Sequence, residues 1–229
     1  MDITSLYAAK LTTPERAVAG IPSGSRVSMG MAVAQPPALL EALADRAGAV
    51  EDLRVYYYET TRIAGDTVLR YELNDRIHPY SMFVTAVDRA LVKRGLEDGG
   101  RKVVTYVPNN FHDAPRLLIE QIGIDTFLHT VSPMDRHGYF SFGTGNDYST
   151  KVARAAKRLI VEVNKNMPRV HGDSTELHVS EVDAIVENHV PLLELPSRGP
   201  GPEDAASHWP HRCRRGAGRP GMGRPAVIT

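Results

Sequence analysis

The chain has 229 residues, of which 42% are hydrophobic and 24% charged, values typical of a folded protein with one large domain or two small ones. Its 27 Lys and Arg residues balance its 27 Asp and Glu residues, so charge does not favour nucleic acid or a membrane as partner. The single cysteine excludes an internal disulfide, no apolar run approaches the roughly 18 residues of a membrane span, and the amino-terminal MDITSLYAAK is unlike a signal peptide. We therefore predict a cytoplasmic protein without disulfides or membrane spans, and no metal is expected.

Strands and helices alternate along the first 195 residues. The predicted helices are 37–48, introduced by Gln35-Pro36-Pro37, then 80–94, 114–122 and 147–158. The predicted strands are 26–30, 53–60, 102–107, 125–132 and 159–164, and 184–190 closes the series. Several strands are nearly all apolar, which indicates an α/β fold: an open, mainly parallel sheet with helices on both faces. Ligands of such sheets bind beyond the carboxyl ends of the strands.

Two predicted helices carry further expectations. Helix 37–48 buries an apolar stripe that includes Leu39, Leu40 and Leu43. Helix 80–94 is expected to place Phe83, Val87, Ala90 and Leu91 on one helical face.

The composition changes near Leu195. Residues 196–229 contain six Pro, six Gly and six Arg, together with the only Trp and the only Cys of the chain. They lack any helical or alternating period until the last few positions. Such a segment buries too little apolar surface to offset its ordering entropy, so it is predicted to be disordered.

The run VSPMDRHGYFSFGTGNDYSTK, residues 131–151, is the densest pattern in the chain. YFSF alternates like a short β-ribbon, and GTGND favours a turn whose Asn146, Asp147 or Ser149 caps the next helix. A glycine-rich turn before a helix could also bind an anion near Lys151. The spacing matches neither phosphate-loop pattern, GxxxxGK[ST] or GxGxxG, so a structural turn is favoured over a phosphate cradle.

A second candidate is SMGMAVAQPP, residues 28–37, where Gly30 ends a predicted strand. Backbone N–H groups there could stabilise an oxyanion, but an ordinary strand-to-helix loop explains the pattern equally well. His112, His171 and His178 lack metal-site spacing and are interpreted as structural. The sequence lacks the GxSxG motif around a nucleophilic serine, so it does not indicate a Ser/His/Asp hydrolase. Tyr56-Tyr57-Tyr58 reads as a strand with aromatic packing.

Four segments together carry a family resemblance. They are TPERAVAGIPSGSRVSMGMAVAQPPALLEAL (13–43), YVPNNFHDAPRLL (106–118), VSPMDRHGYFSFGTG (131–145) and LIVEVNKNMPRVHGDSTELHVSEVDAIVE (159–187). In this order they resemble the acetyl-CoA hydrolase / 4-hydroxybutyrate CoA-transferase family over residues 5–195. The resemblance implies a CoA-transferase fold of two similar α/β halves, with residues 1–195 as the N-terminal domain.

The resemblance also implies a chemistry. The family moves CoA between acids: a glutamate attacks the acyl-CoA thioester, an anhydride and then a glutamyl-CoA thioester form, and a second acid takes the CoA. If water replaces the acid, the enzyme is a hydrolase. CoA is then a substrate, and no cofactor is expected. The resemblance places Gly30, Met31, Gln35 and Pro36 beside the active-site cleft, with Gly143 and Asn146 as a weaker second set.

The sequence departs from the family beyond VPLLELP. The nucleophilic glutamate and most of the CoA-binding surface belong to the family's second half, which does not follow here. Glu41, Glu59, Glu162 and Glu187 occupy no matching position, so no catalytic residue is assigned. Residues 196–229 resemble coding sequence read out of frame, which suggests a frameshift or truncation.

Two functions therefore stay open: an acyl-CoA:carboxylate CoA-transferase acting on short-chain acids, or a non-catalytic fragment or one subunit of a split enzyme. The expected partners are acyl-CoA, a short-chain carboxylate, and either further copies of the chain or a C-terminal half.

Overall fold

The computed structural model describes residues 2–194, and residues 2–192 belong to one compact unit. The helices are α1 (Ile3–Lys10), α2 (Pro14–Ala19), α3 (Pro37–Asp45), α4 (Arg62–Gly65), α5 (Ala86–Glu97), α6 (Ala114–Arg116), which a π-helix at Leu117–Ile122 continues, and α7 (Ser149–Ala155). The strands are β1 (Arg26–Met29), β2 (Leu53–Tyr57), β3 (Ile77–Ser81), β4 (Thr105–Tyr106), β5 (Thr126–Val131), β6 (Tyr139–Ser141), β7 (Arg158–Val163), β8 (Glu176–His178) and β9 (Ala184–Glu187). The predicted disordered segment at 196–229 lies outside the described residues.

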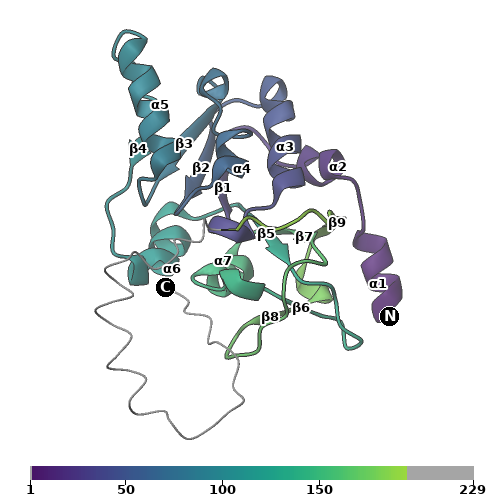
Figure 1. The fold of residues 1–229 in the computed structure, drawn as a ribbon. Coiled ribbons are helices and arrows are strands. Elements are labelled where there is room, and N and C mark those ends of the chain that lie inside the picture. Colours follow the sequence, from purple (N-terminus) through teal and green to yellow (C-terminus); the bar gives the residue numbers. More distant parts are fainter. Residues whose placement is uncertain (1, 195–229) are drawn as a thin grey trace, which may run out of the picture. The chain divides into compact units, whose positions relative to one another are not determined.

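Seven strands form one parallel sheet in the order β4-β3-β2-β1-β5-β7-β9 (Figure 1). The register brings Val27 of β1 level with Val55 of β2 on one side and Thr126 of β5 on the other. The α/β prediction is therefore confirmed. Chain order runs outward from β1 in both directions, so the carboxyl ends of β1 and β5 form the topological switch point, where open sheets of this kind bind ligands.

Two apolar clusters cover the two faces of the sheet. One joins α2, α3, α4 and α5 to the sheet through side chains such as Val18, Leu40, Ala64 and Leu91. The other joins α6 and α7, with α1 at its margin, through Leu118, Val152 and Phe127. The predicted stripe of α3 is confirmed, because Leu39, Leu40 and Leu43 are fully buried.

The predicted helix 80–94 is wrong at its start. Tyr80 and Ser81 belong to β3, a strand that contains Pro79 and was not predicted, and α5 begins only at Ala86. The helix starts there because Thr85 and Asp88 form a reciprocal capping box. Phe83 precedes the helix and is 56% exposed, so the prediction that it shares a helical face with Val87, Ala90 and Leu91 is also wrong. Helices α1 and α2 were not predicted either.

The aromatic packing predicted for Tyr56-Tyr57-Tyr58 is confirmed, since all three rings are buried. Tyr56 stacks on Tyr80 of β3 at 4.6 Å between ring centroids. The hydroxyl of Tyr57 donates to Oδ1 of Asp88 at 2.6 Å, while Oδ2 of Asp88 accepts from Thr85. Strand β2 is thereby fixed to the cap of α5.

We expect Tyr57→Phe to lower the free energy of unfolding by about 2 kcal/mol, because it leaves the buried carboxylate of Asp88 short of a donor. Tyr56→Phe is the matched control: Tyr56 is also buried, at 7% exposure, but no hydrogen bond joins its hydroxyl to a described residue, so a change within about 0.5 kcal/mol is expected. Urea denaturation of both variants measures the difference, and equal losses would contradict the assignment.

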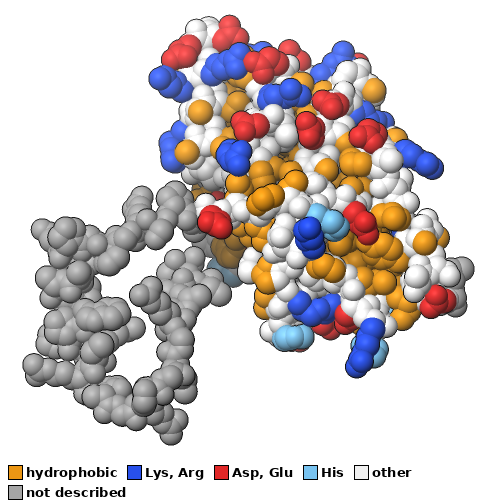
Figure 2. Space-filling model, turned by 45° about the vertical axis from the view of Figure 1, so that its right-hand side comes forward, with side chains coloured by type: hydrophobic (Ala, Val, Ile, Leu, Met, Phe, Trp, Pro, Cys, Tyr) orange, Lys and Arg blue, Asp and Glu red, His pale blue; other side chains and the backbone are white. Residues whose placement is uncertain are grey.

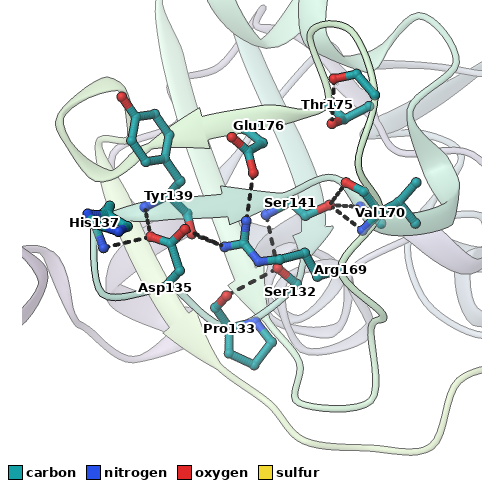
Figure 3. Close-up of polar contacts among 12 residues, drawn as sticks. Ser132, Pro133, Asp135, His137, Tyr139, Ser141, Arg169, Val170, Thr175 and Glu176 are labelled. Carbon is teal, nitrogen blue, oxygen red and sulfur yellow. Dashed lines mark hydrogen bonds and ion pairs between the residues drawn. The ribbon is translucent and has the colours of Figure 1, made fainter.

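The run 131–145 forms a corner on a separate two-stranded ribbon, β6 paired antiparallel with β8 (Figure 3). The backbone N–H of Ser141 donates to Oγ of Ser132 at 2.9 Å. Arg169 reaches Glu176 at 2.8 Å and Asp135 at 3.4 Å, and Asp135 accepts from the N–H of Tyr139. These contacts satisfy the polar groups of the run internally, which supports the structural interpretation of most of this motif.

Candidate functional site

The loop from Gly30 to Pro36 lies at the switch point, between the carboxyl end of β1 and the start of α3. Pro36 is buried at the N-cap of α3, and Pro37 occupies the first helical turn, where a missing N–H costs nothing. Met31 is half-buried and packs against the cluster under α6 and α7. The sequence-predicted set Gly30, Met31, Gln35 and Pro36 is thus one continuous loop at this edge of the sheet.

Gly30 sits where no larger residue fits. A Cβ at this position would lie 2.5 Å from the carbonyl oxygen of Ala34 and 2.8 Å from Cδ2 of His129. The loop turns back tightly because Ala32 adopts a positive φ of 48°, a conformation that costs a non-glycine residue of order 1 kcal/mol. Gly30 is therefore required by the close approach of the loop to its own strand end.

The backbone donors of this loop are mostly used within the fold. The N–H groups of Gly30, Ala32, Ala34 and Gln35 donate to Leu128, Glu59, Met31 and Ala32, respectively. Within residues 2–194, the N–H groups of Met31 and Val33 have no such partner. An oxyanion at this loop would therefore meet the amides of Met31 and Val33 and not that of Gly30.

Gln35 connects the loop to the ends of two other strands, β2 and β5. Its side-chain oxygen accepts from the N–H of Thr61 at 3.2 Å and from its hydroxyl at 2.6 Å, just beyond β2. Its backbone carbonyl accepts from the hydroxyl of Thr130 at 3.1 Å, at the end of β5. The side chain is 1% exposed, and its amide nitrogen has no partner among the described residues. Gln35 holds the loop between β2 and β5.

His129 supports the same loop from β5, and no local pattern in the sequence identifies it as a site residue. Its ring is fully buried, 5.0 Å from the ring of Phe142. Nδ1 lies 2.6 Å from the Thr130 carbonyl oxygen, and Nε2 lies 3.1 Å from that of Gly145. Burial outweighs these two acceptors and lowers the pKa of His129 to about 4, so the ring is neutral at neutral pH.

The second predicted set, Gly143 and Asn146, lies beside the first. A Cβ on Gly145 would come within 2.5 Å of Cβ of Ala34, so the two turns touch directly. Gly143 has a positive φ of 63° and faces Met167, which fixes it as a turn residue. The side chain of Asn146 accepts from the N–H of Thr150 in α7 at 3.3 Å and donates to the carbonyl of Ser174 at 3.1 Å. It thus satisfies one N–H of the first turn, although the N-cap position itself belongs to Tyr148.

A cavity of about 600 Å³ opens beside Asn146. Its wall includes Phe111, Tyr148, Lys151, Arg154 and Asp173. Burial raises the pKa of the carboxyl of Asp147, which also lines it. Tyr148 connects the cavity to the switch point, since its hydroxyl donates to the carbonyl of Met29 at 2.9 Å. The cavity has the volume of a small-molecule site, and its wall carries both positively and negatively charged side chains.

The four glutamates considered from sequence divide into two kinds. Glu41 and Glu59 are exposed, and Glu187 accepts from the hydroxyl of Tyr7 at 2.6 Å. Glu162 is fully buried, where it accepts from the N–H of Leu39 in α3 at 3.1 Å and from the amide of Asn188 at 2.7 Å. Burial raises its pKa to about 7. Glu162 thus serves α3 as a structural carboxyl.

The histidines selected from sequence do not assemble into a site. His112 and His171 are exposed, and His178 caps the short turn at Val179–Glu181 through Ser180. Within residues 2–194, no group of three His, Cys, Asp or Glu side chains is placed to hold a metal ion. In the same part of the chain, no helix has both the length and the apolarity to cross a membrane.

Charges of both signs are interspersed on the surface. Figure 2 shows Lys and Arg next to Asp and Glu over the upper part of one face, with apolar atoms exposed between and below them. Ion pairs such as Arg94–Glu72, at 2.6 Å, and Arg54–Asp52, at 2.7 Å, are of this exposed kind. This face presents no single-sign field that would attract a polyanion.

Comparison with known proteins places this geometry in context. Residues 1–194 match the family described as acetyl-CoA hydrolase/transferase N-terminal domain. The chain is 36% identical over 196 residues to the 4-hydroxybutyrate coenzyme A transferase of Clostridium kluyveri, which covers 85% of this chain and 43% of that protein.

Solved structures agree. RipA from Yersinia pestis superimposes with a TM-score of 0.87 at 71% identity, over 88% of this chain and 47% of that one. A variant of the decarboxylase AibA/AibB shares the fold at 18% identity, with a TM-score of 0.53 over 85% of this chain and 88% of that one. The chain therefore spans less than half the length of the curated relative and of RipA.

Proposed function

The chain belongs to the acetyl-CoA hydrolase/transferase family, and we propose that it forms one half of an acyl-CoA:carboxylate CoA-transferase. The observation that carries this proposal is the loop Gly30–Pro36 at the switch point, with a second turn, Gly143–Asn146, against it. Within residues 2–194 the N–H groups of Met31 and Val33 in this loop have no backbone acceptor. The relative from C. kluyveri is a 4-hydroxybutyrate CoA transferase, and about half its length corresponds to this chain.

In this proposal the loop supplies hydrogen-bond donors and not the nucleophile. The thioester carbonyl of an acyl-CoA develops negative charge when it is attacked, and two fixed N–H groups at Met31 and Val33 lower the energy of that charge. Gln35 and His129 hold the loop in place, so the donors need not reorganise during the reaction. We assign no catalytic carboxylate to this chain. The family resemblance places the attacking glutamate in the second half.

We further propose that CoA is a substrate and that no cofactor takes part, that the acid is short-chain, and that the protein is cytoplasmic. The single cysteine among 229 residues supports the compartment. We also propose that the chain assembles with a C-terminal half, in the same polypeptide or a separate one, or into a homo-oligomer. The share of the relatives that the chain covers supports the C-terminal half.

The proposal predicts that the 229-residue protein alone transfers no CoA from acetyl-CoA to 4-hydroxybutyrate. Addition of the separately produced second half of the C. kluyveri relative is expected to give transfer, measured as 4-hydroxybutyryl-CoA by mass spectrometry. Release of free CoA without an acceptor acid would instead identify a hydrolase.

Two outcomes would overturn the proposal. One is turnover by the 229-residue protein alone, with a CoA thioester on one of its own carboxylates. The other is the lack of any transfer or hydrolysis when the second half is present and bound. The second outcome would leave the non-catalytic fragment as the remaining function.

A further inference from the structure

Large apolar side chains are exposed together beyond the carboxyl ends of β3 and β4. Phe83 is 56% exposed, Tyr106 54% and Phe111 51%, and Val84 is also exposed. Tyr106 pairs with Ser81 at the end of β3, and Phe83 follows two residues later. We call Phe83, Val84, Tyr106 and Phe111 the carboxyl-edge patch.

The patch lies next to the candidate site. Asn109, two residues before Phe111, accepts from the hydroxyl of Tyr58 and donates to the carbonyl of Met82 at 3.4 Å. The ring of Phe111 stands 5.2 Å from that of Tyr58 and 6.4 Å from that of Tyr148. Tyr148 in turn bonds the last residue of β1. Phe111 therefore joins the exposed patch to two buried rings, Tyr58 and Tyr148, that extend to the switch point.

The segments that carry the patch lack charge. Residues 77–87 and 103–112 contain no Asp, Glu, Lys or Arg, although 24% of the chain is charged. Strand β4 pairs with β3 through two residues, which leaves its outer edge without a partner strand among the described residues. Depletion of charge together with exposed aromatic rings distinguishes the centre of a protein interface from ordinary surface.

We propose that the carboxyl-edge patch is the surface on which the second domain of the full-length relatives packs. This inference rests on the proposed function, since it identifies the contact that completes the site. The part of RipA that matches this chain, at 71% identity, makes up 47% of the RipA chain. A further segment of similar length therefore accompanies this fold in RipA. A domain seated on the patch would border the Gly30–Pro36 loop and exclude water from it.

Binding of the separately produced second half of RipA tests the proposal without requiring activity. We expect a complex with the 229-residue protein by isothermal calorimetry, and an affinity at least about tenfold weaker for the variant Phe83→Ser, Tyr106→Ser, Phe111→Ser. Leu96→Ser is the matched control, because Leu96 is 68% exposed on α5 and outside the patch, and its affinity is expected within about twofold of the original.

Each outcome separates the patch from the proposed function. If binding depends on the patch but no CoA transfer occurs, the carboxyl-edge patch is confirmed as the docking surface and the proposed function is contradicted. Transfer that the triple variant supports as well as the original chain would overturn the surface alone. Self-association of the 229-residue protein that the triple variant abolishes, with no binding of the RipA half, would assign the patch to a second copy and overturn the proposal. Unchanged circular dichroism and Tm establish that the triple variant is folded.

Discussion

Gly30→Ala is expected to lower the free energy of unfolding by about 3 kcal/mol, which corresponds to a fall in Tm of roughly 6–12 °C for a domain of this size. The added Cβ would lie 2.5 Å from the carbonyl oxygen of Ala34 and 2.8 Å from its Cβ. Neither atom belongs to a flexible side-chain end. Relief requires movement of the loop, and Ala32 is already held at a positive φ.

Gly48→Ala is the control for this experiment. Gly48 lies in the short turn after α3, and an added Cβ there meets no atom within 4 Å. Its free energy of unfolding is expected to stay within about 0.5 kcal/mol of the original. Differential scanning calorimetry of the two variants gives both numbers. A Gly30→Ala variant as stable as Gly48→Ala would show that the loop adjusts freely, and would remove the basis for a fixed set of donors at Met31 and Val33.

The second large effect concerns pH and two buried groups that oppose each other. The pKa of Glu162 rises from 4.5 to about 7 on folding, so the folded state keeps its proton where the unfolded state has lost it. Stability from this group is fully present below pH 4.5 and declines up to pH 7, by about 3 kcal/mol in total. The pKa of His129 falls from 6.5 to about 4, so stability from that group is present above pH 6.5 and declines by about 3 kcal/mol down to pH 4.

Between pH 4.5 and 6.5 the two slopes cancel. Glu162→Gln removes one of them while keeping an oxygen for the N–H of Leu39 and, after rotation of the Asn188 amide, a partner for that side chain. We therefore expect the free energy of unfolding of the variant, minus that of the original protein, to increase by about 3 kcal/mol from pH 4.5 to 7. All groups that titrate equally in both proteins drop out of this difference.

Urea denaturation at intervals of half a pH unit measures this difference. Glu41→Gln provides the control, because Glu41 is exposed on α3, the helix that Glu162 contacts, and its replacement is expected to change stability by no more than about 0.5 kcal/mol. A difference for Glu162→Gln that stays flat with pH would contradict a buried, protonated carboxyl. NMR titration of the His129 ring measures its pKa separately, and we expect an apparent value of about 4.

The sequence by itself determined the fold class and the position of the candidate loops. Runs such as LRVYY and RLIVEV are rich in apolar β-formers and carry only one or two charges, which favours strands of a sheet covered on both faces, and they form β2 and β7. Gly30 after a strand and Pro36-Pro37 before a helix marked the loop, because the rules for glycine, proline and helix starts are local. The strand at 77–81 was missed for the same reason. Pro79 locally disfavours a strand, yet β3 forms because it pairs with β2 over five residues.

Only the tertiary structure decided what the site consists of. The two candidate loops are separated by more than a hundred residues, and their contact at Ala34 and Gly145 follows from the placement of β5 beside β1. No local pattern distinguishes His129, whose role depends on Gly145 and Ser149 at a distance in the chain. Which amides of the loop stay free likewise depends on acceptors from β5 and from the loop after β2. Local preferences specify the elements, whereas hydrogen-bond partners and close approaches are set by which elements meet.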